Sequence, residues 1–182
     1  MSVGAAARRL ARGLGLHGPT ALVIPVPVAD RLVRRDARAR GLGAHITVLH
    51  PFIDARKLAD ATDVALAECF AAAEPFDFVL QDVERFPSVV YLAPDPADPF
   101  VALTHAVVER WPERLPYEGR FDSVVPHLTV AYGSAVPAGL SAALPLQAEA
   151  REVWLMRKAL RRWWRMRVYP LGHGTASAAA PR

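Results

Sequence analysis

The sequence predicts one α+β domain, and three observations lead to this prediction. The chain has 182 residues, of which 52% are apolar, which is enough to build one substantial core. Segments with the alternation of strands are interleaved with segments of helical period. Their order, with a helix before the histidine-bearing strand in each half, indicates an α+β arrangement with a trace of internal duplication.

The N-terminal half is predicted to contain two strands, with one helix between them and a second helix after them. Residues 20–28 (TALVIPVPV) form the apolar run of a buried strand, and the two prolines favour either a place at a sheet edge or a short element. A second strand is expected over 44–52 (AHITVLHPF). From Asp54 to Ala73, apolar and small residues recur at steps of three and four, which predicts an amphipathic helix that starts near Asp54 and packs on a sheet.

The C-terminal half continues with strands and one more helix. Residues 76–86 and 88–94 alternate in strand fashion and predict an antiparallel pair. A helix with one apolar stripe is expected over 96–110. The remaining strands are expected at 126–133, 148–157 and 163–171, the last two joined by the basic turn KALRR.

Both ends of the chain fall outside this pattern. Residues 1–18 are basic, lack acidic side chains and are rich in alanine and glycine, which predicts a mobile tail. Residues 173–182 have no periodicity and are expected to be loose as well. We therefore expect a single domain over 19–172, in a monomer without an obligate protein partner.

Composition limits the cellular setting. No uninterrupted apolar run approaches the roughly 20 residues that are needed to cross a bilayer, so no membrane partner is expected. Cys69 is the single cysteine, cannot form an internal disulfide, and lies in a helical pattern where a buried structural role is expected. These features fit a reducing, cytoplasmic compartment. The formal charge of +4 suits a polyanionic partner such as RNA.

A pattern of histidine, apolar residue, threonine, apolar residue occurs twice. The first copy contains His45 and Thr47, and the second contains His127 and Thr129. Successive side chains of a strand point to opposite faces, so each histidine shares a face with its threonine while the residues between them enter the core. A single copy would be an ordinary strand, but two copies in matching surroundings predict a shared site.

Two imidazoles and two hydroxyls suit the cleavage of a phosphodiester. In-line attack needs a base for the nucleophile and an acid for the leaving oxygen. A pair of histidines can supply both near neutral pH, because one can be neutral while the other is protonated. The threonine hydroxyls can donate to the nonbridging oxygens, where charge builds up in the transition state. We expect no metal and no cofactor, since neither cysteines nor carboxylates have ligand spacing near the motifs.

The paired motifs and their flanks resemble the 2H phosphoesterase superfamily, which includes 2'-5' RNA ligase-like proteins and cyclic phosphodiesterases. The similar segments are TALVIPVP, ERFPSVVYLAP, PHLTVAYG, EVWLMR and RMRVYPLG, within residues 20–172. The resemblance implies a bilobal fold in which two antiparallel sheets line a central cleft, with helices outside. It also implies metal-independent chemistry by His45, Thr47, His127 and Thr129.

Three aromatic residues near the motifs are candidate substrate-binding residues. Phe52, Phe86 and Tyr132 are predicted to stack a nucleobase at the edge of the site, and burial in the core is the alternative for each. Among the other histidines, His50 has the opposite strand phase to His45 unless a bulge intervenes. His17, His105 and His173 lie in predicted tails or on a helix and are not expected to act.

Two arginine-rich segments, 31–40 and 151–167, can line a path for an RNA backbone or form a solvated face. Trp154, Trp163 and Trp164 are interleaved with the second segment.

The sequence therefore predicts a phosphodiesterase for RNA ends or nucleotides that opens a 2',3'-cyclic phosphate or cleaves a 2'-5' linkage. The same site can run in reverse as an ATP-independent RNA ligase, and a noncatalytic RNA-binding module is a third possibility. Which histidine is the base stays open.

Overall fold

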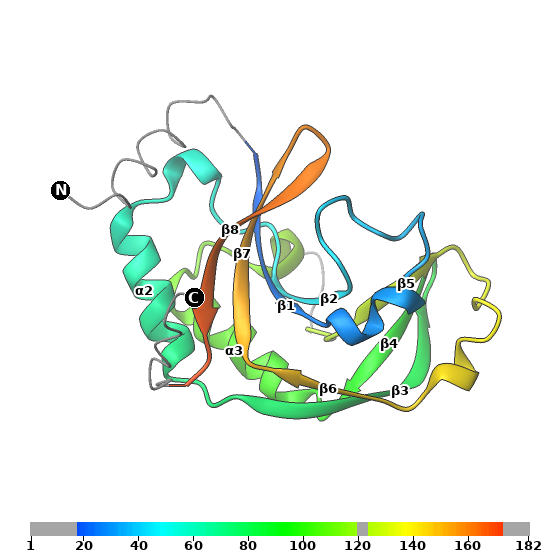
Figure 1. Ribbon diagram of the computed structural model, residues 1–182. Coiled ribbons are helices and arrows are strands. Elements are labelled where there is room, and N and C mark those ends of the chain that lie inside the picture. Colours follow the sequence, from blue (N-terminus) through cyan, green and yellow to red (C-terminus); the bar gives the residue numbers. More distant parts are fainter. Residues whose placement is uncertain (1–17, 120–123, 173–182) are drawn as a thin grey trace, which may run out of the picture.

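The structure is a computed structural model that describes residues 18–119 and 124–172, and its main feature is one strongly curved antiparallel sheet (Figure 1). The predicted tails at 1–18 and 173–182 lie almost wholly outside the described residues. The strands are β1 (Thr20–Pro25), β2 (His45–Leu49), β3 (Phe76–Phe86), β4 (Val89–Asp95), β5 (Leu128–Tyr132), β6 (Leu146–Ala150), β7 (Glu152–Ala159) and β8 (Arg162–Pro170). The helices are α2 (Asp60–Ala71) and α3 (Asp98–Arg110), with short 3-10 helices η1 (Pro27–Leu32), η2 (Ala55–Lys57), η3 (Pro116–Gly119) and η4 (Ser141–Ala143).

The strands form one sheet in the order β6-β3-β4-β5-β2-β1-β7-β8. This corrects the prediction of two sheets. The two strands that bear the motifs pair directly with each other, with Ile46 opposite Leu128, and so join the two halves of four strands each. The separation of the halves into lobes stays a prediction.

Strand β1 lies in the interior of the sheet, between β2 and β7, so of the two expected outcomes the edge position is wrong and the short element is observed. The prolines do not disturb its ladder because Pro25 is its last residue and Pro27 begins η1. The strand predicted over 20–28 therefore ends three residues early.

The strand predicted over 148–157 is two strands. The chain changes partners at Arg151: β6 pairs with β3 at one edge of the sheet, whereas β7 pairs with β1 in the other half. A strand-like pattern of apolar and polar residues continues from β6 through Arg151 into β7. The sequence pattern therefore does not indicate that the chain changes its partner strand there.

Both helices pack on one face of the sheet and enclose the main core. The predicted helix over 54–73 is interrupted: Asp54 accepts from the backbone N–H of Arg56 and caps η2, and α2 begins only at Asp60. Cys69 on α2 is buried, as expected. Thr104 on α3 is buried and donates to the backbone carbonyl of Val48 at 2.8 Å, which ties α3 to β2. Within the described part of the chain, no helix is long and apolar enough to span a membrane.

Candidate active site

The two histidine motifs lie side by side on neighbouring strands. Because Ile46 is opposite Leu128 in an antiparallel pair, the register continued by one residue places His45 opposite Thr129 and Thr47 opposite His127. Ile46 and Leu128 are fully buried on the helix-covered face, whereas all four motif side chains are half-buried on the other face. The four polar groups thus form a diamond on one face, each histidine beside the threonine of the other motif.

Both imidazoles are held in the same way. Nδ1 of His45 lies 2.8 Å from the carbonyl oxygen of Gly43, and Nδ1 of His127 lies 2.8 Å from the carbonyl oxygen of Val125. A carbonyl oxygen can only accept, so Nδ1 carries the hydrogen in both rings. Nε2 is therefore the atom that gains or loses a proton on each histidine.

Burial lowers the pKa of both histidines. It lowers the pKa of His45 below its usual 6.5, against the hydrogen bond to Gly43, and the charge of His127 lowers it further. Burial also lowers the pKa of His127, against its hydrogen bond to Val125. The influence of one ring on the other means that protonation of one disfavours protonation of its partner. A singly protonated pair is the form that acid and base catalysis requires.

Two aromatic rings support His127. Phe86 stacks on Tyr91 at a centroid distance of 4.3 Å, and the rings of Phe86 and Tyr91 meet His127 edge to face at 5.1 and 5.5 Å. The Tyr91 hydroxyl donates to Glu84 at 2.6 Å, and burial together with this bond raises the pKa of Tyr91 to about 12. Tyr91 is also opposite Thr129 in the β4–β5 register.

The structure separates the three aromatic residues that were predicted to stack a nucleobase. Phe86 reaches the site through His127. Phe52 does not, and this is a correction: it is 3% exposed and packs edge to face on Trp111 at 5.3 Å within the main core. Tyr132 ends β5 and is 59% exposed, so its contact with a base stays a prediction.

The other described histidines are His50 and His105. His50 follows β2, whose register with β1 shifts between Thr47 and Leu49, so the irregularity on which the strand phase of His50 depended is present; its ring meets that of Trp163 at 5.8 Å. His105 is exposed on α3. His17 and His173 lie outside the described residues.

Tyr91 is the member of the site that the sequence reasoning missed. Its strand was predicted, and Tyr91 alternates there with buried Val90 and Leu92. Only the pairing of β4 with β5 shows that it faces the histidines, and a single sequence contains no record of that pairing.

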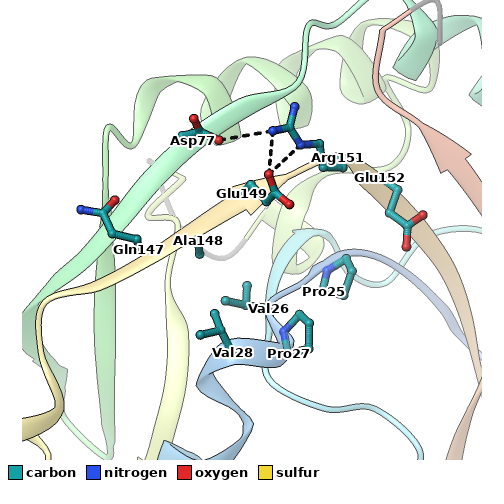
Figure 2. A pocket seen from close by; sticks show the side chains of 10 residues that line it. All are labelled: Pro25, Val26, Pro27, Val28, Asp77, Gln147, Ala148, Glu149, Arg151 and Glu152. Atoms are coloured by element: carbon teal, nitrogen blue, oxygen red, sulfur yellow. Dashed lines mark hydrogen bonds and ion pairs between the residues drawn. The ribbon is translucent and has the colours of Figure 1, made fainter. Parts of the chain in front are cut away.

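A cavity of about 590 Å³ lies between the η1 end of β1 and the corner from β6 to β7 (Figure 2). Neither motif histidine lines it, although its wall residue Pro25 is opposite His45 in the β1–β2 register. Arg151 in its wall contacts Glu149 at 2.6 Å and Asp77 at 3.7 Å, so the charge of Arg151 is already balanced. In the described ranges, no cluster of three histidine, cysteine, aspartate or glutamate side chains is placed to hold a metal ion.

The sequence of this chain matches a known family, and its fold is similar to that of several solved structures. The model of the 2'-5' RNA ligase superfamily matches residues 25–164. TT0787 of Thermus thermophilus is 18% identical with a TM-score of 0.61, over 86% of this chain and 100% of its own. E. coli LigT in apo form is 14% identical with a TM-score of 0.59, over 87% and 99%. E. coli LigT complexed with 3'-AMP is 15% identical with a TM-score of 0.55, over 85% and 98%. No curated protein matches the sequence.

Proposed function

The chain belongs to the 2'-5' RNA ligase superfamily, and on this premise we propose that it is a metal-independent phosphodiesterase for RNA ends or nucleotides. Its reaction is the opening of a 2',3'-cyclic phosphate or the cleavage of a 2'-5' linkage. The proposal makes His45 and His127 the acid and base, with Thr47 and Thr129 as donors to the phosphate.

The observation that carries the proposal is the diamond of the two motifs. Both histidines present Nε2 because the backbone holds Nδ1, and each has a threonine hydroxyl directly across the strand pair. A tetrahedral phosphate offers the complementary set of oxygens: two bridging atoms for the imidazoles and two nonbridging atoms for the hydroxyls. One solved E. coli LigT structure of similar fold holds 3'-AMP, a phosphomonoester of the kind that hydrolysis releases.

The hydrolysis of a cyclic phosphate balances on these four groups. The neutral histidine takes a proton from water through Nε2 while the water oxygen forms a bond to phosphorus. The bond from phosphorus to one ring oxygen breaks on the opposite side, and that oxygen takes the proton from Nε2 of the protonated histidine. The product is a phosphomonoester with a free neighbouring hydroxyl, and the two histidines have exchanged their protonation states.

The same groups can catalyse ligation, which is the reverse of the cleavage of a 2'-5' linkage to a cyclic phosphate. If a ribose hydroxyl replaces water as the nucleophile, one histidine takes its proton while its oxygen bonds to phosphorus; the bond from phosphorus to one ring oxygen breaks, that oxygen takes a proton from the other histidine, and a new phosphodiester forms without ATP. The name of the superfamily favours ligation as the second candidate activity. The direction then depends on which nucleophile the bound end of the RNA admits.

The test is turnover of a panel of 2',3'-cyclic nucleotides, cyclic-ended oligonucleotides and 2'-5' dinucleotides in excess chelator. His45→Ala and His127→Ala are each expected to lower kcat by about 10²–10⁴-fold, the usual contribution of a general acid or base. His105→Ala is the matched control, because it removes an exposed imidazole from α3. The phosphate isomer released by the wild type identifies the bond that is broken.

Full activity of either motif variant would overturn the paired mechanism. Equal RNA binding by the wild type and the double histidine variant, with no turnover by either, would instead identify a noncatalytic RNA-binding module. Turnover that needs an added metal ion after chelation would contradict the metal-independent reaction.

A further inference from the structure

The hairpin of β7 and β8 has an unusual composition for an edge of a sheet. Residues 152–172 include six cations and three tryptophans but one acidic residue, Glu152, at the start of β7. The cations are Arg157, Lys158, Arg161, Arg162, Arg165 and Arg167. Strand β8 is the edge strand of the sheet (orange to red in Figure 1), and part of it is already covered, because the backbone N–H of Trp163 donates to the carbonyl of Arg40 at 2.7 Å.

Part of this hairpin shares a face with the histidine motifs. Thr47 on β2 is opposite Val23 on β1, and Val23 is opposite Trp154 on β7. Directly opposed residues of an antiparallel pair point to the same face. Trp154 is therefore on the motif face, two strand spacings or about 10 Å from Thr47.

The cations on this face lie against aromatic rings. The Arg165 guanidinium lies 4.6 Å from the Trp154 ring centroid, and the Lys158 ammonium lies 5.9 Å from that of Trp163. The Trp154 ring is itself fixed, because its Nε1–H donates to Glu152 at 2.6 Å. These contacts hold two exposed charges in place before any ligand binds.

These cations also lack carboxylate partners. Among the carboxylates whose side chains the structure describes, which exclude Glu118 and residues 120–123, none lies within ion-pair distance of Lys158 or Arg165. Arg167, on the opposite face of β8, shows the contrast: its Nε lies 3.2 Å from Asp63 on α2. The charge on the helix-covered face is thus neutralised within the protein, whereas the charge on the motif face remains for an external anion.

We propose that this face of the β7–β8 hairpin binds the single-stranded chain of an RNA whose end occupies the histidine site. The inference rests on the proposed function and specifies its substrate as an oligonucleotide rather than a mononucleotide. Lys158 and Arg165 can pair with phosphates of a strand. Trp154 and Trp163 are partly buried against Val23, Leu42 and Met156, and the parts that stay exposed can contact bases that are not paired. A duplex would keep its bases stacked on each other and out of reach of the indoles.

The test is the binding of a 5'-labelled single-stranded 10-nucleotide RNA with a 3'-phosphate, measured by fluorescence anisotropy from 25 to 200 mM salt. Such an RNA has no cyclic phosphate to open, so the measurement does not depend on turnover. Lys158→Gln with Arg165→Gln is compared with the control pair Arg56→Gln and Arg167→Gln, which removes the same charge from other surfaces. Thermal unfolding of each variant checks that the fold is retained.

Loss of two phosphate contacts is expected to reduce the slope of log K against log salt by about 1.4, at 0.7 per contact for a single strand. The control pair should leave the slope unchanged. In turnover, the hairpin pair should raise KM for a cyclic-ended 10-mer and leave a cyclic mononucleotide unaffected.

Three results would overturn the inference: no RNA binding by the wild type, equal slopes for the two variant pairs, or equally tight binding of a blunt duplex. Binding of phosphatidylglycerol vesicles through Lys158 and Arg165, without binding of RNA, would assign the surface to membranes instead. If the RNA binds as expected but no substrate turns over, the hairpin surface stands and the proposed reaction fails.

Discussion

Replacement of Phe86 by leucine tests whether this ring supports His127 or binds a nucleobase. The Phe86 ring has two aromatic partners, Tyr91 at 4.3 Å and His127 at 5.1 Å. Each such pair contributes about 0.5–1.5 kcal/mol beyond the burial of area, so Phe86→Leu should lower the free energy of unfolding by about 1–3 kcal/mol. For a chain of this length, this corresponds to a fall in Tm of about 2–12 °C.

The same change should alter the chemistry of His127. Burial is the main cause of its lowered pKa, and Phe86 covers part of the ring, so the pKa of His127 should rise toward 6.5 in the variant. A less constrained imidazole should reduce kcat with little change in KM. The pKa is measured by NMR titration of the histidine ring protons, and the rates with a 2',3'-cyclic mononucleotide.

Phe76→Leu provides the matched control. Phe76 lies on the same strand and also has two aromatic partners, Phe78 at 6.4 Å and Phe100 at 4.9 Å. Its loss should destabilise the fold without altering the pKa of His127. A rise in KM at constant kcat in Phe86→Leu, with the pKa of His127 unchanged, would refute the supporting role and restore the nucleobase contact.

Two further predictions concern the diamond itself. Thr47→Val and Thr129→Val should each lower kcat by about 10²–10³-fold, as for the loss of one donor to a developing oxyanion, and steady-state kinetics that show only a raised KM would contradict this. Because the pKa values of His45 and His127 are both lowered, kcat/KM should fall as pH rises above 6.5 and the acid form is lost. The free energy of unfolding should fall as pH drops below 6.5, because the unfolded chain then binds protons that the folded chain resists; chemical denaturation across this range checks the sign.

The motif strands could be predicted because their signal is local. Strand alternation depends only on neighbouring residues, and it correctly placed Ile46 and Leu128 in the core and the histidines on the other face. The choice of partner strands is not local. The sequence therefore could not show that β2 pairs with β5, nor that the chain changes partners at Arg151.

The aromatic residues near the motifs also show that a single sequence does not reveal which side chains come together in the fold. Phe52 and Phe86 both lie close to a predicted motif or turn, and both are half of an edge-to-face pair. Phe52 follows β2 beyond its last paired residue and turns into the core against Trp111, whereas Phe86 ends β3 on the motif face. Sequence distance from a motif cannot separate these outcomes, since they depend on where each strand ends.

The two motifs have the same hydrogen bonds and the same opposed residues but different neighbours. We therefore expect the neighbours to determine which histidine acts as acid and which as base. Each histidine has the same backbone tether and the same opposed threonine, so neither is marked as acid or base by its own strand. Only His127 is packed against Phe86 and Tyr91. An RNA chain on the β7–β8 hairpin would approach from one side of the diamond and so fix which oxygen of the phosphate meets which Nε2. In this proposed arrangement the two histidines would transfer the protons, and the residues that surround only one of them would determine which histidine is the acid and which is the base.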